Sequence, residues 1–67
     1  MNLSSKALIQ ILEKNGFRFK RSRGSHHIYF NQLSAKTVSV PVHTKDLKKG
    51  TFLGILKQAN IDKNLID

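Results

Sequence analysis

The sequence has no cysteine, a single proline and only 4 acidic residues among its 67. Without cysteine it can form neither disulfides nor cysteine-ligated zinc sites, the usual staples of small secreted domains. It also lacks the roughly 20 consecutive apolar residues that a membrane-spanning helix needs, and residues 1–5 lack the apolar run of a signal peptide. A reducing cytoplasm is the expected location. A chain of this length buries only about 60% of its unfolded surface, so we expect one domain, 1–67, with its site on an open surface.

Positive charge dominates what is present. The chain carries 12 Lys and Arg residues and a net charge of +8. Most of this charge lies between positions 18 and 49, where Asp46 is the one acidic residue among eight basic ones: Arg18, Lys20, Arg21, Arg23, Lys36, Lys45, Lys48 and Lys49. A localized positive field attracts a polyanion and accelerates encounter with it. This favours a nucleic-acid partner over a merely solvated surface, an anionic membrane or an acidic protein.

Hydrophobic spacing predicts a helix at each end of the chain. Over residues 5–14, apolar side chains recur at helical spacing after Ser4 and Ser5, which can cap the helix, and Gly16 can end it. The second helix is predicted to begin at Phe52 behind a Thr51 cap and to end at Asn60. Its predicted apolar face consists of Phe52, Ile55, Leu56 and Ala59. Asp62 is expected to cap a last short turn that holds Leu65 and Ile66.

Three strands are predicted between these helices. Residues 17–21 alternate apolar and basic, residues 25–30 are rich in strand formers, and residues 37–42 place three valines on one face. Turns are expected at 22–24 and 31–35, and Pro41 suggests an edge strand or a strand end. The order helix, three strands, helix predicts an α+β fold. Its antiparallel sheet would be covered by both helices on one face and display Arg and Lys on the open face.

Histidines are the candidates for chemistry. The chain contains His26, His27 and His43, and histidine can take or give a proton near neutral pH. RNA carries its own nucleophile, the 2′-hydroxyl, so a histidine beside cationic donors suffices to cut it without a metal. His26 and His27 are adjacent and would point to opposite faces of a strand, so they cannot easily share a metal ion. We therefore expect no metal and no cofactor, and the alternative is that these histidines are ordinary strand residues.

Other residues have two readings each. Gly24 serves either a turn or the close approach of a phosphate, and Tyr29 either packs in the core or stacks on a base. Lys45, Lys48 and Lys49 either contact phosphates or form a solvated loop. The predicted RNA-binding set consists of Arg21, Arg23, Gly24, Lys45 and Lys48.

Four segments in order resemble the HicA toxin family, and together they cover nearly the whole chain. Residues 8–17 (LIQILEKNGF) resemble its first helix and turn, and residues 23–29 (RGSHHIY) resemble its histidine motif. Residues 38–51 resemble its next strand and loop, and residues 55–59 its last helix. The loop 31–34 departs from the family's usual Pro-Asp-Gly-type turn, which affects only the expected hairpin geometry.

The resemblance implies a double-stranded-RNA-binding-domain-like fold. It further implies a metal-independent endoribonuclease that cuts mRNA, inhibits translation and is neutralised by a HicB-type antitoxin. The histidine after Gly-Ser, His26, would be catalytic. Strict alternation leaves a question open, because His26 faces the core if Ile28 and Phe30 do and faces outward only if Tyr29 turns inward. A bulge near Gly24 would release His26 from this rule, and His27 is the alternative.

Two competing functions share these features. A non-catalytic RNA-binding module would bind RNA without cutting it, and an adaptor for an acidic protein would have no RNA affinity.

Overall fold

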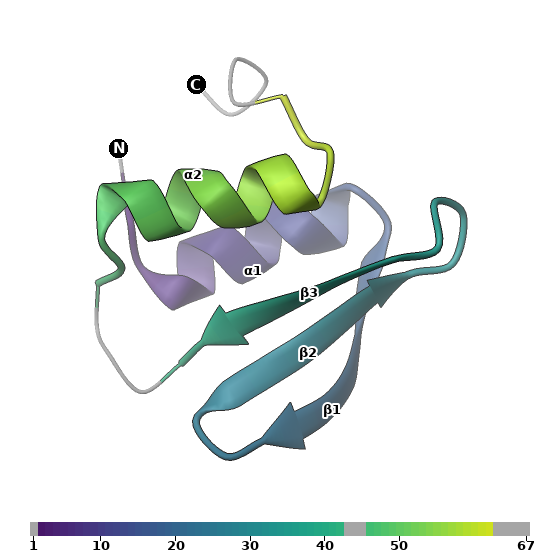
Figure 1. Ribbon diagram of the computed structural model, residues 1–67, viewed down its shortest axis with the longest axis horizontal. Helices are drawn as coiled ribbons and strands as arrows, with labels where there is room; N and C mark the ends of the chain where they lie inside the picture. Colours follow the sequence, from purple (N-terminus) through teal and green to yellow (C-terminus); the bar gives the residue numbers. More distant parts are fainter. Residues whose placement is uncertain (1, 43–45, 63–67) are drawn as a thin grey trace.

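The computed structural model describes residues 2–42 and 46–62. The chain forms, in order, α1 (Ser5–Lys14), β1 (Phe17–Arg23), β2 (His26–Asn31), β3 (Lys36–Pro41) and α2 (Lys49–Gln58). The three strands make one antiparallel sheet in the order β1-β2-β3, and both helices lie on the same face of it (Figure 1). The predicted α+β fold, its element order and its open sheet are confirmed. β3 is an edge strand, as Pro41 suggested.

Helix α1 has the predicted bounds because its ends are fixed by local hydrogen bonds. The Ser4 hydroxyl accepts a hydrogen bond from the amide of Ala7 at 3.1 Å, which satisfies one free donor of the first turn. At the other end the Asn15 side chain donates to the Ile11 carbonyl at 2.8 Å. Gly16 then reverses the chain with a φ of +92°, a conformation that glycine adopts without strain.

The first hairpin is tighter than predicted. β1 continues through Ser22 and Arg23, and the turn consists of Gly24 and Ser25, so the predicted turn at 22–24 is wrong. Gly24 has a φ of +59°, and two-residue hairpins with a positive φ at the first turn position strongly prefer glycine there. The pairing also continues past Pro41, since the Val42 amide donates to the Ser25 carbonyl at 2.9 Å.

Helix α2 begins earlier than predicted. Its N-cap is Lys48, with no side-chain capping bond, so Thr51 lies inside the first turn and the predicted Thr51 cap is wrong. The last helical residue is Gln58, and Asn60 is the residue that stops the helix, as predicted. Asn60 has a φ of +60°, and the Ile61 amide after it donates to the Leu56 carbonyl. Together these form a Schellman-type C-cap. The short turn predicted at 62–66 falls largely outside the described residues.

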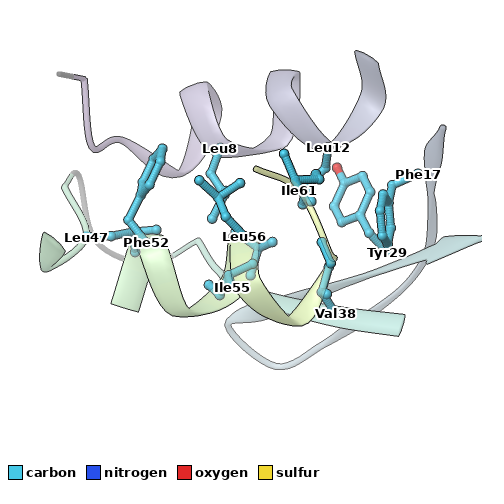
Figure 2. Close-up of a cluster of buried hydrophobic side chains, with 12 residues drawn as sticks. Leu8, Leu12, Phe17, Tyr29, Val38, Leu47, Phe52, Ile55, Leu56 and Ile61 are labelled. Atoms are coloured by element: carbon cyan, nitrogen blue, oxygen red, sulfur yellow. The ribbon is translucent and has the colours of Figure 1, made fainter. Parts of the chain in front are cut away.

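The core lies between the helices and one face of the sheet (Figure 2). Its members are Leu8 and Leu12 from α1, Phe17, Tyr29, Val38 and Val40 from the sheet, Leu47, the four predicted residues Phe52, Ile55, Leu56 and Ala59, and Ile61. The rings of Phe17 and Tyr29 lie at the same end of this cluster. Each of the two described helices has ten residues, and neither is long and apolar enough to cross a membrane.

Candidate nucleic-acid interface

Strand register decides which side chains reach the open face. Tyr29 is paired with Val38, and both are buried in the core, so this pair points toward the helices. By alternation along β2, His26, Ile28 and Phe30 point to the opposite, open face. The alternative in which Ile28 and Phe30 face the core is therefore wrong. Tyr29 turns inward instead, and His26 faces outward.

A β-bulge in β1 gathers the arginines on the same face. Phe19 pairs with Tyr29 on the helix side, but Arg21, two residues later, pairs with Ile28 on the open side, so Lys20 is the extra residue. Without this bulge, alternation would place Arg21 and Arg23 on the face of Phe19. A bulge near Gly24 is not needed to turn His26 outward, and pairing is regular from Arg21 to Arg23.

His26 occupies the first residue pair beyond the β1–β2 turn. It lies between Arg23 on β1 and Pro41 on β3, and its side chain is exposed. Residues directly opposite one another share a face, so Arg23 and His26 stand together on the open face. Gly24 immediately precedes this pair, and a Cβ added to Gly24 would meet no atom within 4 Å. Its positive φ, rather than local crowding, accounts for the glycine.

His27 has a different environment on the helix side. It is half-buried, and its ring meets the Phe19 ring edge-on with centroids 5.3 Å apart. Phe19 makes a similar contact with Tyr29 at 5.8 Å. The helices do not cover this end of β1, because Phe19 remains 53% exposed. The structure thus separates His27 from the arginines that accompany His26.

Tyr29 packs in the core and does not offer a ring to a base. It is only 5% exposed. Burial raises the pKa of its phenol, and the negative charge of Glu13 raises that pKa further. Of the two readings left open for Tyr29, packing is the one confirmed.

Of the two lysines in the predicted RNA-binding set, only Lys48 lies among the described residues. Lys48 is exposed at the start of α2, in the helical layer. The segment before it is tied to the start of α1 by the Leu47 amide, which donates to the Leu3 carbonyl at 2.8 Å. Lys45 and His43 lie outside the described residues. Among the described residues, 2–42 and 46–62, no three His, Asp or Glu side chains form a group that could hold a metal ion.

Sequence reasoning missed Phe30 as a surface residue. Phe30 lies opposite Arg18 on the open face, and the Lys20 ammonium stands 5.4 Å from its ring centroid. These three residues line a hollow of about 490 Å³, whose other lining residues are Gly16, Phe19, Gln32 and Leu33. If Tyr29 is assigned to the core, the next residue in the strand, Phe30, must face outward, so this assignment would have revealed Phe30 as a surface residue.

Fold and surface together define a small α+β domain with an open, cationic sheet face and an exposed histidine at one end. The family model described as HicA toxin of bacterial toxin-antitoxin systems matches residues 5–61. The chain belongs to this family, and its role is that of a toxin in a toxin-antitoxin system, with an antitoxin as partner. A search of curated proteins found no relative that matches.

Proposed function

We propose that the protein is a histidine-dependent endoribonuclease that cuts mRNA on the open sheet face. The observation that carries the proposal is the pairing of Arg23 with His26 on that face, one residue from the turn glycine. His26 supplies an imidazole, the side chain that most often serves as a general base, and Arg23 supplies a fixed positive charge. Membership in the toxin family favours a destructive activity over passive RNA binding.

The proposed reaction is an internal transesterification. The 2′-oxygen of one ribose attacks the adjacent phosphorus, the new P–O2′ bond forms, and the P–O5′ bond breaks. The 2′-hydroxyl proton passes to His26 as general base, and the departing 5′-oxygen takes a proton from water. The products are a 2′,3′-cyclic phosphate and a 5′-hydroxyl end. Arg23 and Arg21 stabilise the negative charge that develops on the phosphorane oxygens.

RNA is held by the cations on and beside this face. Arg21 and Arg23 contact phosphates near His26. The RNA strand can come close to the backbone at Gly24 because that residue has no side chain. Lys45 and Lys48 remain part of the proposed contact set because they add positive charge that an RNA backbone can meet. The reaction as written requires no metal or cofactor.

Inducible expression of wild type, His26→Ala and His27→Ala tests the assignment. His26→Ala should abolish growth arrest and cutting of purified mRNA, while His27→Ala retains both if its fold persists in thermal unfolding. Cutting by the wild type should survive excess EDTA. Full toxicity of His26→Ala would transfer the role to another residue. RNA binding without any cutting by the wild type would favour the non-catalytic module.

We further propose that the antitoxin is of the HicB type and covers the open face around His26. A strongly basic surface pairs best with an acidic partner, and complementary charge accelerates association. Such a partner would exclude mRNA from the same cations.

A further inference from the structure

A second feature of the open face lies at the end of β2 away from His26. Phe30 is one of the residues that line the hollow of about 490 Å³, which is within the size range of small-molecule sites. Its side chain is only partly buried and is not part of the core cluster. Leu33, which also lines the hollow, is 95% exposed. An aromatic ring and an aliphatic side chain thus line the same hollow as two cations, Arg18 and Lys20.

The two cations at this hollow have different freedom. The Arg18 guanidinium donates to the Glu13 carbonyl at 3.0 Å and to the Phe17 carbonyl at 2.8 Å, so Nη1 is held beside the end of α1. The exposed Lys20 instead reaches over the Phe30 ring. Lys20 is therefore the cation that can move to a ligand while staying close to the ring.

We propose that this hollow is a stacking subsite for one base of single-stranded RNA, with Phe30 as the platform and Lys20 on an adjacent phosphate. The inference rests on the proposed function and extends it to the class of substrate. A duplex keeps its bases stacked and paired, whereas an unpaired strand can lay a base on an aromatic side chain. The overall positive charge of the face fits a nucleic acid better than an apolar protein segment.

Magnitudes support displacement of Lys20 by a base. An exposed cation–π contact contributes about 2- to 5-fold to an equilibrium, whereas base–aromatic stacking contributes about 5- to 150-fold. The base therefore outcompetes the ammonium for the ring. Lys20 then gains a phosphate partner, so its interaction is exchanged rather than lost.

The spacing links this subsite to the cutting site. Phe30 follows His26 by four residues on the same face, which corresponds to about 13 Å along a strand. A stacked nucleic-acid strand advances about 3.4 Å per nucleotide, and an extended strand advances further. The stacked base would thus lie within about four nucleotides of the scissile phosphate.

The test compares two uncleavable probes of equal length and charge. One is an eight-nucleotide 2′-O-methyl oligouridylate, whose blocked 2′-oxygen prevents cutting, and the other is the same backbone without bases. For wild type, removal of the bases should weaken binding about 5-fold or more. In Phe30→Leu this penalty should fall below about 2-fold, and in Phe30→Trp it should persist because the ring face is restored.

Lys20→Gln separates the cation from the platform. It should keep the penalty for base removal but lower the log–log salt slope by about 0.7, the value for one phosphate contact on a single strand. Lys57→Gln, on the exposed side of α2, is the matched control and should change neither quantity.

Three outcomes would overturn the subsite: no binding of the oligouridylate at low salt, an equal base penalty in wild type and Phe30→Leu, or a penalty lost in Phe30→Trp as well. Cutting of ordinary mRNA by wild type is measured in parallel. If mRNA is cut while Phe30 has no effect on the base penalty, the subsite is wrong and the proposed activity stands. If the Phe30 effect is present without cutting, the activity is wrong and the subsite stands.

Discussion

Arg23 lies directly opposite His26 in the β1–β2 pair, although in a regular strand it would share the face of Phe19. The extra residue at Lys20 shifts the second half of β1 by one position and so reverses which face its side chains occupy. Two arginines thereby reach the open face, while Phe17 and Phe19 keep the helix side. This local irregularity concentrates positive charge around the exposed histidine.

The first prediction concerns this charge. Arg21→Ala and Arg23→Ala should each lower the log–log salt slope of single-stranded RNA binding by about 0.7, because each loses one phosphate contact. Arg23→Ala should also slow cutting, since it lies opposite His26. Lys57→Ala serves as a control of equal charge change in the helical layer. Unchanged slopes in both arginine variants would place the RNA on another surface.

Much of the fold was accessible from periodicity. The bounds of α1, the three-stranded meander and the buried face of α2 follow from apolar spacing and from strong end signals such as Ser4 and Gly16. The start of α2 was misplaced because Thr51 is a better cap than Lys48 by residue type. Packing of Leu47 and Phe52 into the core outweighs that preference.

The site was less accessible because it depends on register. Sequence pointed to His26, but Ile28 and Tyr29 are both strand formers and either one can face a core. Only pairing with Val38 assigns Tyr29 inward. The bulge at Lys20 has no sequence signature of its own, since neither glycine nor proline marks it.

The second prediction concerns Asn31, a buried polar residue that joins three segments. Its Nδ2 donates to the Asn15 carbonyl at 2.9 Å, and its Oδ1 accepts from the amides of Leu33 and Ser34 at 2.9 and 3.2 Å. Asn31→Ala should lower the free energy of unfolding by roughly 1–3 kcal/mol, because these groups lose their partner. Urea unfolding measures this loss.

The neighbouring exposed Gln32 provides the control for that measurement. Gln32→Ala should change the free energy of unfolding by less than about 0.5 kcal/mol. Asn31→Asp, which keeps the acceptor but loses the donor to Asn15, should fall between the two. Equal stability of wild type and Asn31→Ala would show that the bonds are replaced by water at no cost.

The third prediction concerns pH and Tyr29. Burial first, and Glu13 second, raise the pKa of Tyr29 above its ordinary value near 10. The folded state therefore holds this proton more tightly than the unfolded state does, and the associated stability is fully present below about pH 10. It is lost as pH rises through the folded-state pKa.

Thermal unfolding of wild type and Tyr29→Phe at a series of pH values from about 8 to about 12 measures the effect, since this range brackets the ordinary tyrosine pKa. The stability of the wild type relative to the variant should decline above about pH 10. In that range the unfolded wild type releases the Tyr29 proton more readily than the folded protein does, and the variant has no such proton. Lysines titrate in the same range, but they are common to both proteins and cancel in the difference. A difference that stays constant with pH would show that Tyr29 ionises as easily in the folded state.

The last prediction concerns the antitoxin. If the partner covers the open face, hydrogen exchange in the complex should slow at the β1–β2 turn and at the edge amides of β1, while the exposed side of α2 around Lys57 is unchanged. Arg21→Glu and Arg23→Glu should slow association, because each reverses a charge on the covered face, whereas Lys57→Glu should have a smaller effect. The purified complex should neither bind the oligouridylate nor cut mRNA. Protection confined to α2, together with cutting at the free toxin's rate, would show that the antitoxin leaves His26 accessible and acts by some other route.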